Sequence, residues 1–383
     1  MANQRMRAAV IWAPGKPWDI VELAYDDPKD HEVVVRLAAA GMCHSDDHLR
    51  SGDTPMRYPM VGGHEGAGVV EQVGPQVSRV AVGDRVVATF IPACGTCRYC
   101  STGRQNLCDK GLNAGTGLML DGSYRLHAPH DDLGGFCALG TFAERMVVSE
   151  YSCLQLPDDI PFEIGALLSC GVPTGWGSAV RAARVQPGDT VVIYGAGGVG
   201  INAVQGAALA GAGRVVVVDP NPMKRERADE FGATDTFAAH EEAQAFVTDA
   251  TRGQLADHAI ITVSVNDQEV VSQAVNIVGK GGQVTLTAIG NQAQDWVVAN
   301  GNLLIGYEKR IQGALFGSCR VLTDIPLLID LYREGKLRLN ELISNRYSLD
   351  QVNEGYADLL AGKNLRGIIS FPESDPAAAR ANR

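Results

Sequence analysis

Four cysteines lie within a stretch of 15 residues, at Cys94, Cys97, Cys100 and Cys108. Their thiolates are soft ligands, and four of them suit a closed tetrahedral zinc site with no position left for a substrate. Free thiols and an iron–sulfur cluster are the alternatives, although the spacing differs from that of the ferredoxin cysteine runs. The motif therefore predicts a structural zinc, held by a lobe of about residues 94–108.

A glycine-rich segment, Gly195–Gly200, directly follows an expected strand and opens an expected helix. Such a turn lets backbone N–H groups and a helix N-terminus approach a pyrophosphate. Asp219 ends the next expected strand, where its carboxylate would bind a ribose diol and repel a 2′-phosphate. A tight turn that only packs a helix closely is the alternative. In this context the segment predicts NAD in preference to NADP, with Asn221 and Lys224 in reach of the adenosine ribose.

A third set of metal-binding side chains is dispersed along the chain. It comprises Cys43, the pair His64-Glu65, and Cys170. Spacing alone favours buried cysteines and a core histidine, with a joint metal site as the alternative. The residues by themselves leave both interpretations open.

Length and composition limit what else the chain can be. Its 383 residues, 45% hydrophobic and 20% charged, predict two globular domains. A net charge of -11 without a long basic block disfavours nucleic acid as a partner. With neither an apolar run of about 18 residues nor a secretion signal, we expect a cytoplasmic protein that does not enter a membrane. Nine cysteines, largely clustered, indicate reduced thiols rather than a disulfide framework.

Two patterns of elements must position these residues. Up to about residue 150, Gly and Pro punctuate short β-rich runs, which predicts an irregular all-β unit. From about Pro187 strands and helices alternate, which predicts a parallel sheet with crossover helices. The expected β runs are Glu32–Leu37, Gly68–Val73, Asp84–Thr89, Thr190–Tyr194, Arg214–Asp219, His258–Val263 and Gln283–Ala288, and the expected helices of the second pattern are Val199–Ala210 and Pro222–Phe231.

The C-terminal block is too short to hold a core of its own. It contains two amphipathic stretches, Asp324–Arg333 and Asp350–Leu360, and a last β run, Gly367–Phe371. Asp350 is the expected cap of the second helix. We expect this block to pack on the N-terminal β unit.

The sequence resembles the zinc-containing medium-chain dehydrogenase/reductase family, in its alcohol dehydrogenase branch. The resemblance rests on GMCHSDDH, GGHEGAG, CGTCRYCSTGRQNLC, LLSCGVPTGWGSA and YGAGGVG followed by VVDPNPMK, in family order from about Ala8 to Phe371. It implies an α/β protein of two domains. A GroES-like irregular β-barrel catalytic domain would span 1–171 and 317–383, and a Rossmann NAD-binding domain with a doubly wound parallel sheet would span 172–316.

For the dispersed set, the resemblance implies a catalytic zinc. Cys43, His64 and Cys170 would bind it. Glu65 would lie behind it as an occasional alternative ligand, and Asp46 would orient His64. In this family zinc acts as a Lewis acid on the alcohol, whose hydride passes to the nicotinamide.

The resemblance also implies a proton relay and contacts to the cofactor. Ser45 would receive the alcohol proton and pass it through the nicotinamide ribose to His48 at the surface, with a turn hydroxyl and a solvated histidine as the alternatives. His44 replaces a pyrophosphate-binding arginine of many members, and Arg366 could reach the pyrophosphate from the other domain. The expected cofactor-binding residues are His44, Thr174, Gly195, Gly197, Gly198, Val199, Gly200, Asp219, Asn221, Lys224 and Arg366.

Within that branch, three segments resemble the actinobacterial nitrosoaniline (NDMA)-dependent nicotinoprotein alcohol dehydrogenases. They are MRAAVIWAPGKPWDI, CHSDDHLRSGDTPMRYPMVGGHEGAG and FIPACGTCRYCSTGRQNLCD. Members of that subgroup retain NAD(H) and reoxidise it in place. We therefore expect a zinc- and NAD-dependent alcohol dehydrogenase with two zinc ions per chain, an alcohol or aldehyde substrate, an electron-acceptor partner, and a homodimeric or homotetrameric assembly.

Two alternatives compete with this hypothesis. A thiol-adduct formaldehyde dehydrogenase could use mycothiol or glutathione, although Gly111–Tyr124 lacks the Arg that binds the glutathione adduct in such enzymes. The second alternative is a non-catalytic sensor that binds zinc and NAD. The complete set of zinc ligands and the relay pair disfavour it, because a protein that only binds needs neither. Three expectations concern residues outside these sites. We expect a solvated loop at Gly111–Gly140, which contains His127, His130, Asp131 and Asp132. We expect structural thiols at Cys137, Cys153 and Cys319, and pocket walls or core aromatics at Phe90 and Trp176.

Overall fold

The computed structural model describes residues 4–290, 295 and 299–371. The chain forms two compact units. Unit 1 comprises Met1–Cys170, Arg320–Asp330 and Leu339–Arg383, and unit 2 comprises Gly171–Cys319 and Leu331–Arg338. The described part of unit 1 ends at residue 371, so the rest of the C-terminal stretch of the predicted 317–383 segment lies outside the described residues.

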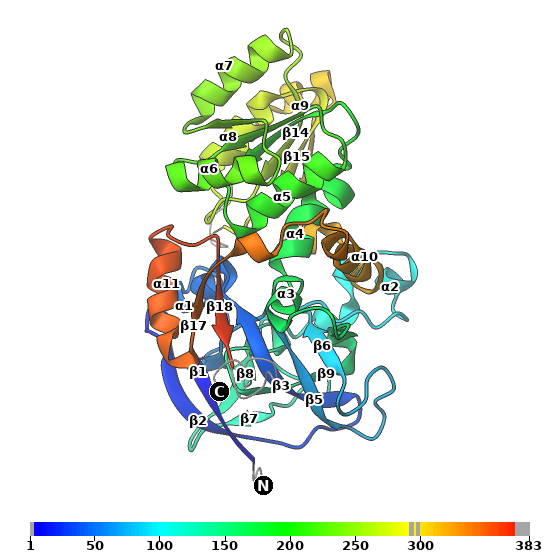
Figure 1. Cartoon of the computed structure of the whole chain (residues 1–383), viewed down its shortest axis with the longest axis vertical. Helices are drawn as coiled ribbons and strands as arrows, with labels where there is room; N and C mark the ends of the chain where they lie inside the picture. Colours follow the sequence, from blue (N-terminus) through cyan, green and yellow to red (C-terminus); the bar gives the residue numbers. More distant parts are fainter. Residues whose placement is uncertain (1–3, 291–294, 296–298, 372–383) are drawn as a thin grey trace. The chain divides into compact units, whose positions relative to one another are not determined.

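Unit 1 is mainly β-structure, built from a closed barrel and a seven-stranded sheet (Figure 1). The barrel order is β1-β2-β7-β8-β4, and the sheet order is β10-β6-β5-β3-β18-β17 with β9 also paired to β3. The barrel strands are β1 (Gln4–Ile11), β2 (Asp19–Tyr25), β4 (Met60–Val61), β7 (Leu126–His127) and β8 (Asp132–Gly135). The sheet strands are β3 (Glu32–Gly41), β5 (Gly66–Val73), β6 (Arg85–Ala88), β9 (Arg145–Ser149), β10 (Cys153–Gln155), β17 (Ile343–Tyr347) and β18 (Arg366–Ser370).

Strand β3 is the centre of the unit 1 sheet. Val33, Val34 and Val35 are all fully buried, so this strand shows no alternation between a buried and an exposed face. It pairs antiparallel with β5, β9 and β18, with Ile368 opposite Gly41. The C-terminal strand therefore completes a sheet whose other strands come mostly from the first half of the chain. The predicted β runs at the positions of β3, β5 and β6 are confirmed.

Unit 1 also contains helices that the pattern of Gly and Pro between short β runs did not predict. They are α1 (His44–Ser51), α2 (Arg98–Ser101) and α3 (Phe162–Leu167). Helix α1 carries a single apolar side chain, Leu49, which is fully buried, and it ends at Gly52 with a φ of 89°. An eight-residue helix with so little apolar surface is stabilised by its surroundings more than by its own sequence.

The C-terminal helices are α10 (Val321–Arg333) and α11 (Val352–Leu360). The predicted cap at Asp350 is wrong. A turn of 3₁₀ helix precedes α11, and Ser348 and Gln351 close it as a reciprocal capping box. Asp350 lies inside that turn rather than before it, and its carboxylate forms an ion pair with Arg7.

Unit 2 is a six-stranded parallel sheet in the order β13-β12-β11-β14-β15-β16, with helices α5 to α9 packed on its strands (Figure 1). The sheet runs outward in both directions from β11 and β14, which is the doubly wound arrangement that the sequence predicts. The strands are β11 (Thr190–Tyr194), β12 (Arg214–Val218), β13 (Asp235–Phe237), β14 (Ala256–Ile261), β15 (Val278–Leu286) and β16 (Arg310–Gly313). The helices are α4 (Gly171–Gly177), α5 (Gly198–Leu209), α6 (Pro222–Glu230), α7 (His240–Ala250), α8 (Gln268–Ile277) and α9 (Gly301–Tyr307).

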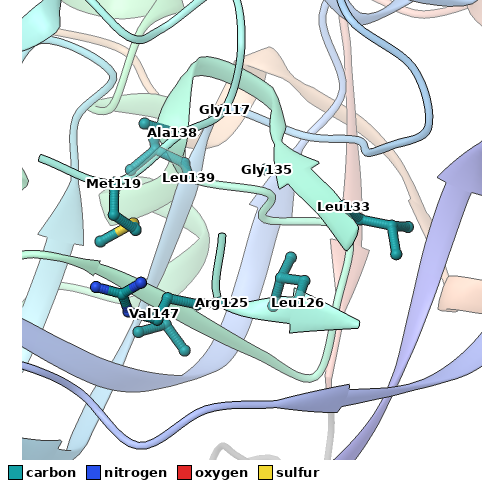
Figure 2. A pocket seen from close by; sticks show the side chains of 9 residues that line it. All are labelled: Gly117, Met119, Arg125, Leu126, Leu133, Gly135, Ala138, Leu139 and Val147. Carbon is teal, nitrogen blue, oxygen red and sulfur yellow. The ribbon is translucent and has the colours of Figure 1, made fainter. Parts of the chain in front are cut away.

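A small pocket lies in unit 1, with Met119, Leu133 and Val147 among its lining residues (Figure 2). Arg125, its charged member, is 2% exposed, and its Nε and Nη2 donate to the two carboxylate oxygens of Glu32 at 2.8 and 2.6 Å. Because Glu32 already engages this guanidinium, the pocket offers no unpaired charge to a ligand. In the described part of the chain, no helix is both long enough and apolar enough to cross a membrane.

Candidate active site and cofactor loop

The structure brings the dispersed metal-binding set together in unit 1. The ligand atoms of Cys43, His64, Glu65 and Cys170 all lie within 4.8 Å of one another, and all four residues are buried. Cys43 stands between β3 and α1, His64 and Glu65 between β4 and β5, and Cys170 directly before α4. Four loop or terminal positions on different elements thus converge on one point.

The imidazole of His64 is oriented by a buried carboxylate. Its Nδ1 lies 3.0 Å from Oδ1 of Asp46, and the same oxygen accepts a hydrogen bond from the backbone N–H of Gly63 at 3.0 Å. This arrangement assigns the ring hydrogen to Nδ1 and leaves the Nε2 lone pair for another partner. Among the described residues Nε2 is buried without a hydrogen-bond partner. An orphaned nitrogen beside two thiols is a donor set that fits zinc.

The charges within this cluster favour a cation at its centre. A hydrogen bond with Cys170 lowers the pKa of the Cys43 thiol well below its ordinary value. Burial lowers the pKa of His64, but the charges of Asp46 and Cys170 outweigh it and hold that pKa well above its ordinary value. The groups therefore favour a thiolate beside an imidazolium. A divalent metal ion meets the same electrostatic demand when it replaces the proton on Nε2 of His64, which leaves the ring with its hydrogen on Nδ1.

Behind the cluster, Glu65 forms an ion pair with Arg366. Both residues are buried, at 0% and 4% exposure. Burial raises the pKa of Glu65 to about 7, although Arg366 opposes the shift. Gly41 is required here because a Cβ on it would lie 2.0 Å from Oε2 of Glu65. Arg366, which the resemblance assigns to the cofactor, thus lies against the predicted alternative metal ligand.

Two phenylalanines flank His64, and sequence reasoning named only one of them. The ring of Phe90 lies 5.7 Å from the imidazole and that of Phe136 lies 5.3 Å from it, both edge-on. Cys137 follows Phe136, and burial raises the pKa of its thiol to about 12, which keeps it protonated and unreactive. Apolar rings around the imidazole restrict water at this side of the cluster.

Tyr356 is a further residue of the site that the sequence did not indicate. It is 2% exposed, and its hydroxyl donates to the backbone carbonyl of Cys43 at 3.3 Å. It lies in the stretch that the sequence predicts to be amphipathic, but that pattern says nothing about a contact 313 residues away in sequence. No local signal in the chain could have identified this contact.

The predicted relay residues lie on α1, and one expectation about them is wrong. Ser45 Oγ lies 3.7 Å from the Sγ of Cys43. His48 was expected at the surface but is 5% exposed, because α1 turns it inward next to Leu49. Its Nδ1 lies 3.2 Å from Oδ2 of Asp53, whose side chain is 40% exposed. The group that reaches solvent is therefore Asp53, which also accepts from Ser51 Oγ at 2.7 Å.

The four clustered cysteines also converge. Their sulfur atoms lie within 4.8 Å of one another, with 3.9 Å between Cys94 and Cys100 and 4.0 Å between Cys97 and Cys108. A tetrahedral zinc with Zn–S distances of about 2.3 Å separates its sulfurs by about 3.8 Å, so this geometry fits zinc. Burial alone would raise the pKa of Cys94, but N–H groups of Cys97 and Thr96 and the Thr96 hydroxyl lower it to about 6.

In unit 2 the glycine loop leaves space where a phosphate would bind. Gly195 has a φ of +90°, and a Cβ on Gly200 would lie 1.8 Å from the carbonyl oxygen of Gly195. A Cβ on Gly197, by contrast, would meet no atom of the described residues within 4 Å. Gly198 and Val199 open helix α5. The first and last glycines are thus required by the turn itself, and the middle one leaves an open approach to the N–H groups.

Asp219 directly follows β12, and its side chain also holds the glycine loop. Its Oδ2 accepts from the backbone N–H of Ala196 at 2.8 Å, and its Oδ1 accepts from that of Asn221 at 2.9 Å. Asn221 in turn caps α6 by accepting from Met223 N–H at 3.0 Å. Lys224 follows, half-buried, on the first turn of that helix. Each carboxylate oxygen keeps a second lone pair, which fits the ribose diol of a dinucleotide.

The remaining predicted cofactor residues lie in both units. Thr174 is 9% exposed on α4, and the adjacent Gly175 allows close contact with α5, since its Cβ would lie 2.1 Å from the carbonyl oxygen of Val199. His44 is the first residue of α1 and is half-buried. Trp176 is 3% exposed and Arg181 lies over its ring at 5.2 Å, so it is packed within unit 2.

Comparison with known proteins decides the family. The description "alcohol dehydrogenase GroES-like domain" matches residues 29–158, and "zinc-binding dehydrogenase" matches residues 198–334. The NDMA-dependent alcohol dehydrogenase of Amycolatopsis methanolica is 52% identical over 365 residues, which cover 95% of this chain and 98% of that protein. The chain belongs to the zinc-binding alcohol dehydrogenase family.

Other members of this family are similar along their whole length. Alcohol dehydrogenase B of Mycobacterium tuberculosis is 44% identical and covers 97% of this chain and 100% of its own. The crystal structure of benzyl alcohol dehydrogenase from Acinetobacter calcoaceticus has a TM-score of 0.88 at 29% identity, covering 96% of this chain and 99% of that one. The predicted family, its GroES-like and Rossmann-type fold, and its oxidoreductase activity on alcohols are confirmed.

Proposed function

We propose that this protein oxidises primary alcohols, or reduces the matching aldehydes, and keeps its NAD(H) bound between turnovers. The observation that carries the proposal is the buried cluster of Cys43, His64 and Cys170, in which an orphaned Nε2 is aimed by Asp46. The 52% identity to an NDMA-dependent alcohol dehydrogenase supports reoxidation of the cofactor in place by an external acceptor.

We propose two zinc ions per chain, one catalytic and one structural. Cys43, His64 and Cys170 would hold one, with Glu65 as the occasional fourth ligand, and the lobe cysteines would hold the other. When bound in the first site, zinc supplies a Lewis acid that makes the hydroxyl of an alcohol more acidic. The aromatic rings of Phe90 and Phe136 keep that site apolar. The lobe has four thiolates and therefore no position left for chemistry.

Unit 2 would hold the dinucleotide on the Gly195–Gly200 loop, with Asp219 on the adenosine ribose. NAD, when bound, supplies the hydride acceptor. The carboxylate of Asp219 disfavours a 2′-phosphate and so selects NAD over NADP. Thr174 and Val199 are proposed at the nicotinamide, with Asn221 and Lys224 at the ribose and His44 and Arg366 at the pyrophosphate.

A proton must leave the buried site when an alcohol is oxidised. Ser45, beside Cys43, is the proposed first acceptor, and His48 holds the proton next. His48 is buried, so we add Asp53 as the exit group, since it contacts His48 Nδ1 at 3.2 Å and is 40% exposed. Hydrogen bonds from Ser51 and then His48 lower the pKa of Asp53, which keeps this carboxylate ionised and able to accept at neutral pH.

Unit 1 is the proposed catalytic domain and unit 2 the proposed NAD domain. From the properties of the family we also propose a homodimer or homotetramer, an electron-acceptor partner and a cytoplasmic location.

The test is the absorbance spectrum of desalted protein before and after acid release of the cofactor. We expect about one NAD(H) per chain to stay with the protein, because retention through desalting needs a very small dissociation constant. Turnover of a primary alcohol should then require an acceptor such as a nitrosoaniline. Protein that is free of cofactor and fully active on added NAD alone would exclude retention and leave an ordinary alcohol dehydrogenase.

A further inference from the structure

The four-cysteine lobe is held from outside by three residues with no role so far. Arg79 lies between the unit 1 strands β5 and β6. Its Nη1 donates to the backbone carbonyl of Ala93 at 2.7 Å, and its Nη2 donates to that of Cys94 at 2.8 Å. One guanidinium therefore fixes two successive peptide groups at the first cysteine of the lobe.

A buried carboxylate fixes Arg79 in turn. Glu150 is fully buried, and its Oε2 accepts from the backbone N–H groups of Ser78 and Arg79 at 2.8 and 2.9 Å. Its Oε1 lies 2.6 Å from Nδ1 of His31. Burial alone would raise the pKa of Glu150, but those N–H groups and His31 outweigh it and the pKa is lowered. The carboxylate is thus ionised at neutral pH and holds the turn that carries Arg79.

Tyr151 links the two ends of the cysteine run. Its backbone carbonyl accepts from the N–H of Ala93 at 2.9 Å, one residue before Cys94. Its ring carries the Arg79 guanidinium at 4.7 Å and the Lys110 ammonium at 4.8 Å. Lys110 comes two residues after Cys108, the last cysteine of the lobe. Both ends of the run therefore contact one residue, the first through the backbone carbonyl of Tyr151 and the last through its ring.

We propose that Arg79, Glu150 and Tyr151 form a clamp that positions the four cysteines for their metal ion and slows its release. This proposal rests on the structural zinc of the proposed function. Zinc with four thiolates carries a net charge of -2, and the two cations stacked on Tyr151 offset that charge. Residues that orient metal ligands in this way typically change metal affinity by about 10–100-fold when they are replaced.

The test is the rate at which the full-length protein transfers zinc to a chromophoric chelator. The measurement is repeated in a His64→Ala background, where the remaining zinc belongs to the lobe. We expect Arg79→Gln and Tyr151→Leu to release the lobe zinc about tenfold faster than the parent protein. Tyr151→Phe keeps the ring and should release it at the parent rate.

Arg85→Gln is the matched control. Arg85 also donates to two backbone carbonyls, those of Asp158 and Ile160, at 2.5 Å each, and lies over the ring of Phe162 at 4.1 Å. None of these partners belongs to the cysteine lobe. We therefore expect Arg85→Gln to leave the release rate of the lobe zinc unchanged.

Two results would overturn the clamp: parent-like release from Arg79→Gln and Tyr151→Leu, or equal acceleration by Arg85→Gln. If Arg79→Gln does not fold, Arg79→Lys decides, because it keeps the charge but offers no planar fork for two carbonyls and should still release zinc faster. A parent protein without lobe zinc, whose metal content Cys97→Ser does not change, would instead reject the structural zinc itself.

Discussion

Unit 1 holds two candidate metal sites, the four-cysteine lobe and an active-site cluster of Cys43, His64, Glu65 and Cys170, which are assembled in opposite ways. The lobe takes four cysteines from one run of 15 residues, whereas the active-site cluster collects ligands between Cys43 and Cys170 from the ends of separate elements. The lobe is closed by thiolates alone. The active-site cluster includes an imidazole whose Nε2 has no protein partner among the described residues. A local run makes a stabilising site, and a site built by the fold leaves a position for chemistry.

The largest effect on folding should come from the lobe. Cys97→Ser removes one of four thiolates from a site where metal binding and folding are coupled, so we expect destabilisation on the order of 5 kcal/mol and poor solubility. Soluble yield and thermal unfolding measure it. Cys153→Ser, at a buried cysteine outside both clusters, is the control and should cost less. A soluble, active Cys97→Ser protein with one zinc per chain would contradict the structural role.

Damage to the active-site cluster should abolish turnover while the protein stays folded, in contrast to damage to the lobe. His64→Ala removes the orphaned nitrogen but no part of unit 2, so we expect folded protein whose turnover falls by at least about 1000-fold. Alcohol turnover and circular dichroism measure the two properties. His127→Ala is the control, because His127 pairs with Asp26 and Asp132 at the edge of the barrel. Activity of His64→Ala within about tenfold of the parent would mean that no metal at this site assists the reaction.

A smaller effect should follow from loosening His64 without removing it. Asp46→Asn replaces the carboxylate that accepts from Nδ1 and from the Gly63 N–H, and we expect zinc affinity at this site to fall by about 10–100-fold. A competitive chelator titration measures it. Asp47→Asn, next to it on α1 but paired with Arg50, should leave that affinity unchanged. Equal affinity losses at the lobe would show that Asp46 acts on folding in general.

The smallest effect should come from the proton exit. Asp53→Asn removes a carboxylate that is ionised at neutral pH, and we expect kcat to fall about three- to tenfold, with recovery on addition of a small buffer base. Steady-state rates at several buffer concentrations measure it. The depressed pKa of Asp53 means that the parent should lose the same contribution as acidic pH protonates this carboxylate. A loss of rate that no buffer reverses would assign Asp53 a structural role only.

Sequence patterns predicted the motifs and strands that are formed by residues close together in the chain. The cysteine lobe and the glycine loop are local motifs, and the strands β11 and β12 are apolar runs with sharp ends. The predicted parallel sheet follows from their alternation with helices, whereas its doubly wound order was implied by the resemblance. Family resemblance, rather than spacing, singled out Cys43, His64 and Cys170.

Contacts between distant segments could not be predicted from one sequence. Phe136 and Tyr356 reach the active-site cluster from remote elements. Phe136 lies in no recognisable pattern, and the amphipathic pattern around Tyr356 does not say which segment it contacts. The burial of His48 was missed because α1 has one apolar residue and no helical periodicity to reveal it. The predicted cap at Asp350 lies two residues from Ser348, which caps the 3₁₀ turn before α11, because both residue types are good caps and only the fold decides between them.

The pairing of β18 with β3 also sets an order of events during synthesis of the chain. The sheet of unit 1 needs a strand that ends at Ser370, and the ion pair of Glu65 needs Arg366. Every residue up to Ser370 must therefore be synthesised before this sheet is complete. Most of unit 2 is continuous from Gly171 to Cys319 and can fold while translation continues. The environment of Glu65 is therefore completed only after Arg366 has been synthesised, whereas all four lobe cysteines are present once Cys108 has been added to the chain.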